Sequence, residues 1–308
     1  MSLLIFKEHT MTSLTYELIN ETDGLPVRFE LICAPPTTIP AHWHKYVEIL
    51  FLLSGSLTAV IQAETYKLSA GDILIINSED IHMTQTLGEK TEYLLLQISA
   101  SQLYHFFADF HLLHFTTLIP KETHQDNPGI YLQDMLSIFQ KKEDGYAILF
   151  SARLHELIYC LYRHHSRWMT AGAHTLAHRN FSRIAATLEW IQNHYQEPLN
   201  LGEAADHLGF SRVYFCRLFK EYTGQTFLEY VNGVRAINLN EDLYRCDDSI
   251  TAQMEKHGIT NYKVFLHTFR KLYGDTPQRI RKSKDSKMLP YFESNCSGRR
   301  ENRCKSRR

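Results

Sequence analysis

The chain has 308 residues, with 33 lysines and arginines against 34 aspartates and glutamates, so its formal net charge is only −1. A chain of this length suggests two domains. It has no run near the roughly 18 apolar residues of a membrane-spanning helix, and the first ten residues lack the apolar core of a signal peptide. These features argue against a membrane or exported protein and predict a soluble, cytoplasmic one.

The first third of the chain predicts β-strands. Runs of alternating or β-branched residues lie at Arg28–Ala34, Val47–Leu53, Ser56–Gln62, Asp72–Asn77 and Glu92–Ser99. Turns are expected at Ser54-Gly55, Ala70-Gly71 and Leu87-Gly88, because glycine tolerates turn conformations. Strands at this spacing predict an antiparallel sandwich or barrel.

Two motifs in this region carry imidazole and carboxylate groups. The segment HWHKYVEILFLLSG contains His42, His44 and Glu48, and the segment GDILIINSEDIH ends at His82. Both motifs resemble those of cupin barrels, and the resemblance implies that three imidazoles and one carboxylate converge inside a jelly roll. Metal-dependent cupin enzymes use this set as ligands for iron, manganese, nickel or zinc.

Two interpretations of these residues stay open. The first is an effector pocket lined by His42, His44, Tyr46, Glu48 and His82, and the second is a metal site formed by His42, His44, Glu48 and His82. Asn77 and Glu79 stand where the second cupin motif usually has Pro and Gly, which weakens the likeness to the enzymes. Aromatic faces beside several hydrogen-bonding groups suit a sugar or a small organic acid. We expect neither catalysis nor a required cofactor.

A helical segment follows. Pro128-Gly129 opens a predicted helix that runs through Phe139, and a second helix is predicted from Tyr146 to His164. The second helix has an apolar stripe formed by Leu154, Leu157, Ile158 and Leu161. Such a stripe forms either an inter-domain contact or a dimer face, and we favour the dimer. Ser166–His178 would then be the linker.

Near the C-terminal end one pattern occurs twice, 50 residues apart. The copies are FCRLFKEYTGQTF, which begins at Phe215, and FLHTFRKLYGDTP, which begins at Phe265. A repeat of this kind indicates a duplicated structural unit. Each copy predicts the second helix of a helix-turn-helix. In the first unit Leu201 opens a short helix, Gly209 makes the turn, and the next helix is capped by Ser211 and Gly224.

The two predicted recognition helices have distinct faces. In the first, a buried stripe contains Phe215, Leu218, Phe219 and Tyr222. The outward faces would enter the DNA major groove. The candidate DNA-binding residues are Arg212, Val213, Tyr214, Cys216, Arg217 and Lys220 in the first helix and Tyr262, Lys263, His267 and Arg270 in the second.

The region from about Phe181 to Arg281 resembles the DNA-binding domain of the AraC/XylS family of transcription regulators. The likeness rests on GFSRVYFCRLFKEYTGQTFLEY, on FRKLYGDTPQRIR, and on Arg235, Ile250 and Gly258. It implies two helix-turn-helix units joined by one long helix, here about residues 226–245, which sets the recognition helices roughly 34 Å apart along DNA. It also implies a homodimer that responds to an effector, binds promoter DNA and RNA polymerase, and more often activates than represses.

The second unit departs from the family pattern. Gln253 and Met254 stand where the family has an Ile-Ala pair, and Ile259 stands where it has Phe. Met254 is large at the position where the two helices should approach most closely. We therefore expect the first unit to read bases and the second to contact phosphates.

Charge is distributed unevenly. Residues 1–179 carry twelve basic and nineteen acidic side chains, residues 180–281 twelve of each, and residues 282–308 nine basic and three acidic. The last segment is predicted to be a disordered tail whose natural partner is the phosphate backbone.

The sequence thus predicts an α+β chain. Its parts are a cupin-like jelly-roll barrel over residues 1–120, a helical dimerisation segment and linker over 121–178, an all-α double helix-turn-helix domain over 179–281, and a basic tail over 282–308. The predicted function is an effector-responsive, DNA-binding transcription regulator. The alternatives are a cupin metalloenzyme with a vestigial helical domain and a degenerate regulator that acts through protein contacts alone.

Overall fold

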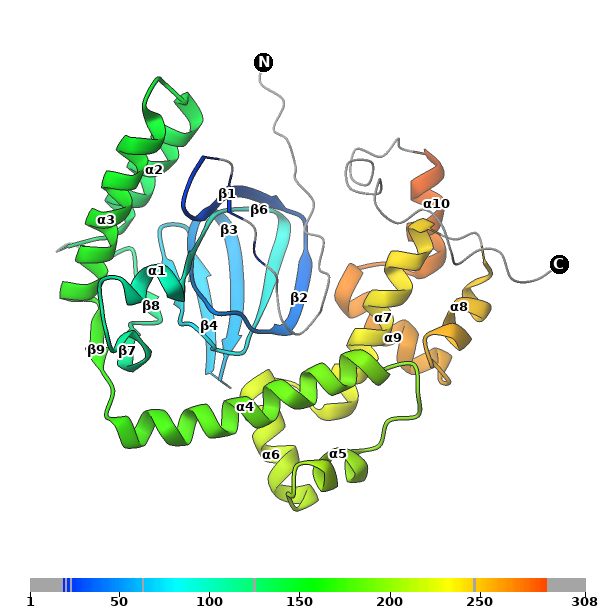
Figure 1. Ribbon diagram of the computed structural model, residues 1–308. Coiled ribbons are helices and arrows are strands. Elements are labelled where there is room, and N and C mark those ends of the chain that lie inside the picture. The colour runs from blue at the N-terminus through cyan, green and yellow to red at the C-terminus, as the bar shows by residue number, and fades with distance from the viewer. Residues whose placement is uncertain are drawn as a thin grey trace.

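The computed structural model describes residues 19, 21, 22, 24–62, 64–123, 126–245 and 248–286. An antiparallel sheet domain comes first and a helical domain follows, as Figure 1 shows. The predicted α+β fold class is therefore confirmed. Among the described residues, no helix is both long and apolar enough to cross a membrane.

Within the described residues the sheet has seven strands. They are β1 (Arg28–Ala34), β2 (Thr37–His42), β3 (Tyr46–Ile61), β4 (Glu64–Ser69), β5 (Ile73–Ile76), β6 (His82–Ser99) and β8 (Leu118–Ile119). The long strands β3 and β6 pair with each other from end to end. β1 and β2 occupy successive parts of the other edge of β6, and β5 and β4 do the same for β3. The sheet curls into the barrel-like cup seen in Figure 1.

Two of the three predicted turns are wrong. Strand β3 runs straight through Ser54-Gly55 with shifts in register, and Leu87-Gly88 lies inside β6. Gly55 has a φ of +83°, and a Cβ there would lie 2.7 Å from the carbonyl oxygen of Lys90. Glycine is needed at this point because two long strands approach closely at a bulge. Ala70-Gly71 does form the predicted turn, between β4 and β5.

The apolar run of β3 is buried on both faces. Ile49 and Phe51 face a core that they share with helices α2 (Gly129–Lys141) and α3 (Tyr146–His164). Leu50 and Leu52 belong to a separate core inside the curled sheet. A strand that is buried on both sides reads as a continuous apolar run and not as an alternating one.

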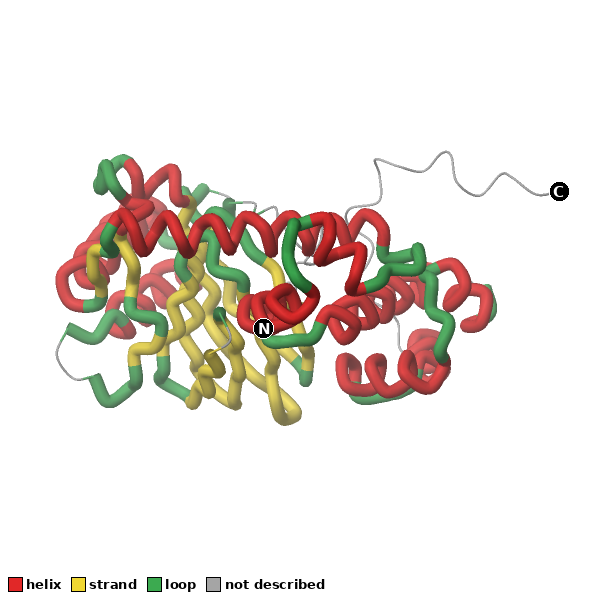
Figure 2. The backbone as a smooth tube through the Cα atoms, turned by 90° about the horizontal axis from the view of Figure 1, so that it is seen from below, coloured by secondary structure: helices red, strands yellow, loops and turns green. Residues whose placement is uncertain are grey.

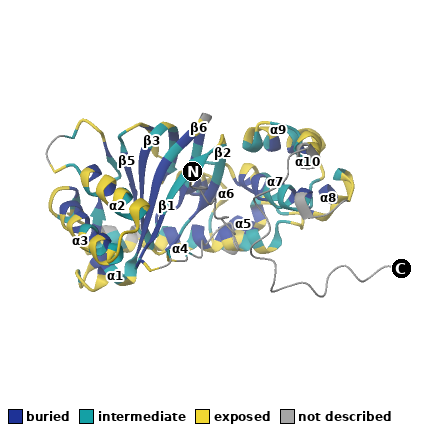
Figure 3. Cartoon of the chain, turned by 90° about the horizontal axis from the view of Figure 1, so that it is seen from above, coloured by how far each residue is buried: buried dark blue, intermediate teal, exposed yellow. Residues whose placement is uncertain are grey.

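The apolar stripe of α3 is an internal contact. Leu154, Leu157, Ile158 and Leu161 are each at most 7% exposed and pack in the core between helices and sheet. The prediction that this stripe forms a dimer face is wrong, because the outer face of the sheet is itself apolar and requires a cover. Figure 3 shows the buried strands beside α2 and α3, whose exposed sides face away from them. The homodimer itself stays a prediction.

Short elements and a long helix connect the two domains. After α1 (Ala100–Tyr104) and a 3-10 turn (Phe110–Leu112), strand β7 (Leu113–Phe115) pairs with β9 (Ser166–Trp168). Helix α4 (Ala171–His194) then passes along the barrel to the helical domain, as Figures 1 and 2 show. The boundary predicted between residues 178 and 179 falls inside α4, so most of the predicted linker is helical.

The helical domain contains both predicted helix-turn-helix units. The first consists of α5 (Leu201–His207) and α6 (Arg212–Thr223), and the second consists of α8 (Ile250–Lys256) and α9 (Tyr262–Tyr273). Helix α7 (Phe227–Arg245) joins them, close to the predicted bounds of 226–245. Helix α10 (Pro277–Ser286) includes residues 282–286, so these five belong to a helix and not to a disordered tail. The rest of the predicted tail lies outside the described residues.

The core of the barrel domain can be tested on α3. Leu157→Ala should lower the free energy of unfolding by about 2 to 5 kcal/mol, because truncating a buried leucine leaves a cavity. Tyr159 lies on the same helix and is 63% exposed, so Tyr159→Ala should change stability by less than about 0.5 kcal/mol. Urea denaturation followed by tryptophan fluorescence measures both. Equal losses would contradict the position of α3.

Candidate ligand site and nucleic-acid interface

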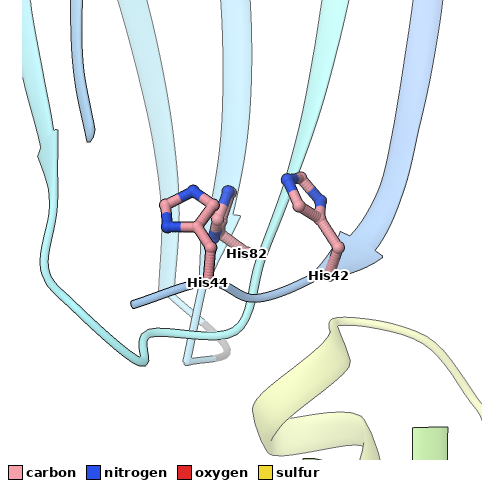
Figure 4. Close-up of side chains that lie close together, drawn as sticks. All are labelled: His42, His44 and His82. Carbon is pink, nitrogen blue, oxygen red and sulfur yellow. The ribbon is translucent and has the colours of Figure 1, made fainter. Parts of the chain in front are cut away.

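Three histidines meet at one end of the barrel, as Figure 4 shows. His42 ends β2, His82 begins β6 directly opposite it, and His44 follows in the loop before β3. All three side chains are buried. The ring centroids of His42 and His82 are 4.1 Å apart, and those of His44 and His82 are 5.0 Å apart. One potential ligand atom of each ring lies within 4.8 Å of the others. We call these residues the histidine cluster.

Hydrogen bonds to the backbone determine which nitrogen of each ring carries a proton. Nδ1 of His42 donates to the carbonyl oxygen of Pro40 at 2.9 Å, and Nδ1 of His82 donates to that of Asp80 at 2.8 Å. A carbonyl oxygen only accepts, so in the neutral ring the lone pair is on Nε2. Burial lowers the pKa of His82 well below its ordinary value, which makes this ring neutral at pH 7.

His44 connects the cluster to a buried acid. Its Nε2 lies 3.0 Å from Oε2 of Glu48, and its Nδ1 lies 3.2 Å from the carbonyl oxygen of Tyr46. Burial by itself raises the pKa of Glu48, but the hydrogen bond with His44 and the charge of that ring outweigh it and hold this pKa well below its usual range. Glu48 is therefore ionised. Both nitrogens of His44 face oxygen acceptors, an arrangement that an imidazolium satisfies.

Two further residues, Gln97 and Arg28, contact the site and were not predicted from the sequence. Nε2 of Gln97 donates to Oε2 of Glu48 at 2.6 Å, and Nη1 of Arg28 donates to Oε1 of Gln97 at 3.1 Å. The register places Gln97 directly opposite Glu48 on one side and Arg28 on the other. The sequence signal that could have identified Gln97 is its position as a polar residue within the otherwise apolar part of the strand predicted at Glu92–Ser99.

The other predicted site residues lie around the cluster. The ring of Tyr46 is 6.1 Å from that of His44, at the start of β3. Asn77 clamps the turn before His82 to β7, because its side chain donates to the carbonyl oxygen of Phe115 at 3.1 Å and accepts from the amide of Phe115 at 2.8 Å. Glu79 has a φ of +68°. This conformation favours glycine, which is the usual residue here in cupin motifs.

The strands that carry the histidines also contact the helical domain. Ala41 and Ile81, which directly precede His42 and His82, do not belong to the histidine cluster. Both are fully buried in one core with residues of α4, α6 and α7. The hydroxyl of Tyr230 on α7 donates to the carbonyl oxygen of Ala41 at 3.0 Å.

Further contacts extend this interface. The ring of Trp43 packs edge-on against that of Phe181 on α4 at 5.0 Å. The side-chain amide of Gln225 donates to the sulfur of Met83 at 3.3 Å. The first helix-turn-helix unit thus packs against the backbone segments that carry the histidine cluster.

The first recognition helix, α6, has the predicted faces. Ser211 caps it by accepting from the amide of Tyr214, and Gly224 ends it with a φ of +70°. The predicted stripe, Phe215, Leu218, Phe219 and Tyr222, is buried. On the other side the exposed residues are Arg212, Val213, Cys216, Arg217 and Lys220. The ring of Tyr214 is half-buried beneath the guanidinium of Arg217 at 5.4 Å. That these residues contact DNA stays a prediction.

The second recognition helix, α9, is similar in outline. Asn261 caps its start, Gly274 ends it, and Phe265 and Phe269 are buried. The predicted DNA contacts Tyr262, Lys263, His267 and Arg270 are all exposed.

Met254 is accommodated within the second unit. It is buried in a core with residues of α7 and α9, and its carbonyl oxygen accepts from the amide of Ile259, as that of Ala205 accepts from Phe210 in the first unit.

Arg235 on α7 binds the segment that connects α4 to α5. Its guanidinium donates to the carbonyl oxygens of Tyr195 and Glu197, each at 2.7 Å, just after the end of α4. The turn of the second unit packs on the same segment, because a Cβ at Gly258 would meet the carbonyl oxygen of Gln196. Both units are therefore anchored on the segment between α4 and α5.

The fit of Met254 is testable. Met254→Ala should destabilise the second unit by about 2 kcal/mol or more, because a cavity opens in the core shared with Phe265 and Phe269. Met254→Leu keeps the volume and should cost less than about 1.5 kcal/mol. Thermal unfolding of the full chain, followed by circular dichroism, compares the two. A Met254→Ala variant as stable as the wild type would show that the helices close around the smaller residue.

Two family models match the chain. A model described as an AraC-like ligand binding domain matches residues 28–158, and one described as a helix-turn-helix domain matches residues 204–283. Curated relatives include the HTH-type transcriptional activator RhaS of Pectobacterium carotovorum subsp. carotovorum, 25% identical over 262 residues, covering 80% of this chain and 89% of the relative. RhaS of Escherichia fergusonii is 24% identical over 271 residues, covering 82% and 91%.

Solved structures also match. ToxT from Vibrio cholerae is 13% identical, with a TM-score of 0.44, over 83% of this chain and 98% of ToxT. A protein of unknown function from Listeria innocua is 31% identical, with a TM-score of 0.31, over 32% of this chain and 95% of that protein.

Proposed function

We propose that this chain, which belongs to the AraC/XylS family of transcription regulators, binds promoter DNA through α6 and α9 and controls that binding through a small ligand held in its barrel. One observation carries the control step: the first helix-turn-helix unit packs on the strand segments that carry the histidine cluster. A cupin metalloenzyme finds no support, because relatives that span both halves are named as transcription regulators.

Several finer points belong to this proposal. The ligand contacts are His42, His44, Tyr46, Glu48 and His82. The chain acts in the cytoplasm as a homodimer and contacts RNA polymerase. Activation is favoured because the RhaS relatives are named activators. A sugar as ligand stays a prediction from the sequence. The division into domains at residues 120, 178 and 281 also stays a prediction.

The coupling between ligand and DNA follows from the shared strand segments. A ligand changes a conformational equilibrium only if its affinity differs between the two arrangements. Movement of His42 or His82 toward a ligand also moves Ala41 or Ile81, which lie in the core of the first helix-turn-helix unit. Packed cores switch between discrete arrangements and do not deform smoothly. A small shift at the histidine cluster therefore changes how the first unit docks on the barrel.

DNA recognition can be tested on α6. Genomic fragments captured by the purified full-length protein are sequenced to obtain its operator. Arg217→Ala should then lose roughly 1 to 3 kcal/mol of discrimination at one base position, whereas Lys220→Ala should weaken binding to operator and random DNA alike. Mobility-shift titrations on both kinds of DNA measure this. Equal losses on both for Arg217→Ala would show that Arg217 does not read bases, and failure to capture any preferred fragment would reject the proposed function.

The docking of the two domains can be tested at Tyr230. Tyr230→Phe keeps the ring but leaves the carbonyl oxygen of Ala41 without its donor, which should weaken docking by about 1 kcal/mol. Hydrogen exchange should then quicken in residues 37–44 and in 224–234 together. Tyr159→Phe, on an exposed position, is the control and should leave both segments unchanged. Unaltered exchange at 37–44 in Tyr230→Phe would argue against coupling through this contact.

A further inference from the structure

We propose that His42, His44 and His82, with Glu48 as the fourth ligand, bind one divalent transition-metal ion, and that this ion is the ligand to which the DNA-binding domain responds. The claim that the ion binds is argued from the geometry of the site. The claim that DNA binding responds to the ion rests on the proposed function.

The first argument is the orientation of the rings. In all three histidines Nδ1 faces a backbone carbonyl oxygen two residues away, at 2.9 Å for His42, 3.2 Å for His44 and 2.8 Å for His82. Histidines that bind metals typically use the second ring nitrogen in this way, which fixes the ring and directs the lone pair of the other nitrogen to the ion. The cluster thus has the supporting contacts of a metal site on three separate ligands.

The second argument is an orphaned atom. Nε2 of His82 is buried and has no hydrogen-bond partner among the described residues. A buried polar atom without a partner is destabilising, and native structures nearly always satisfy such atoms. The ring that carries this nitrogen is the central one of the cluster, since the ring of His82 is nearer to His42 and to His44 than these two are to each other. A cation bound there supplies the missing partner.

The third argument is size. The ring centroids are 4.1 to 6.0 Å apart, a separation that suits one ion held between the rings. A tetrahedral ion with metal–nitrogen bonds of about 2.1 Å needs nitrogens about 3.4 Å apart. One potential ligand atom of each of the three histidines lies within 4.8 Å of the others, and Oε2 of Glu48 lies 3.0 Å from Nε2 of His44, so modest side-chain rotations complete the site.

Ligand chemistry selects the class of ion. Three imidazoles and one carboxylate suit zinc, cobalt, nickel or iron(II), whereas magnesium and calcium prefer oxygen ligands. Glu48 is buried, and Gln97, which also contacts Arg28, orients its carboxylate.

The ion would also connect to the helical domain. Coordination draws His42 and His82 together across paired strands, and their neighbours Ala41 and Ile81 lie in the core of the first helix-turn-helix unit. Binding of the ion therefore changes the packing at that interface without any direct contact between ion and DNA-binding residue.

Metal binding is measured first, on the full chain without DNA. Protein stripped with a chelator is titrated with Zn²⁺, with Co²⁺ as a probe of visible absorption, and with Mg²⁺ as the negative control. We expect one Zn²⁺ per chain to survive gel filtration, and intense Co²⁺ bands typical of a four- or five-coordinate site. His82→Asn should weaken Zn²⁺ binding by more than about 100-fold, beyond the loss typical for residues that only support a ligand.

A matched control separates this site from other histidines. His174 lies partly exposed with its ring 5.1 Å from His111 and 5.7 Å from His178, so His174→Asn tests adventitious surface binding and should retain the wild-type affinity. Glu48→Gln serves as a second variant if His82→Asn fails to fold. Unchanged affinity in a folded His82→Asn or Glu48→Gln, loss of binding in His174→Asn, or weak six-coordinate Co²⁺ bands would overturn the site.

The response to the ion is measured second, with the captured operator. Zn²⁺ should change the dissociation constant of the wild type for DNA by at least about fivefold and leave that of His82→Asn unchanged. Tight metal binding with no effect on DNA affinity would overturn the sensing role alone. Absence of operator binding with and without Zn²⁺ would reject the proposed function, while the stoichiometry and spectrum still decide the metal site.

Discussion

The pairing of His42 with His82, each directly preceded by an apolar residue, is the constraint on which the rest of this molecule depends. His42 and His82 belong to the histidine cluster, while the preceding residues Ala41 and Ile81 lie in the core of the first helix-turn-helix unit. The geometry of the histidine cluster and the docking of the DNA-binding domain therefore depend on the same backbone segments.

Strand pairing also explains how charged groups persist within an apolar barrel. Arg28, Gln97 and Glu48 lie side by side on β1, β6 and β3, and each hydrogen-bonds to the next. Such a network is stable when its members are paired, and removal of one link leaves a buried charge without compensation. The network ends at His44, so strand pairing across the sheet also positions one wall of the cluster.

Local signals predicted most of the elements because they act over a few residues. The cap at Ser211, the stop at Gly224 and the bounds of α3 and α7 follow from side chains within one or two turns. The turns predicted at two glycines were wrong for a physical reason. Gly55 allows a bulge where two strands approach closely, and a glycine in the sequence is compatible with a bulge as well as with a turn. Gln97 and Arg28 were missed because strand register, and not proximity in sequence, brings them to Glu48.

The sequence by itself determined the duplicated helix-turn-helix units, their exposed recognition faces and the four residues His42, His44, Glu48 and His82, because each depends on periodicity or on a short motif. Only the tertiary structure decided that the apolar stripe of α3 covers the sheet and that the first unit docks on the histidine-bearing strands. An apolar stripe indicates that it will be buried, because its burial removes apolar surface from water. It does not indicate which part of the protein will cover it. The path of the whole chain determines which apolar surfaces pack together. It places α4 along the barrel and brings α6 and α7 against the segments beside His42 and His82.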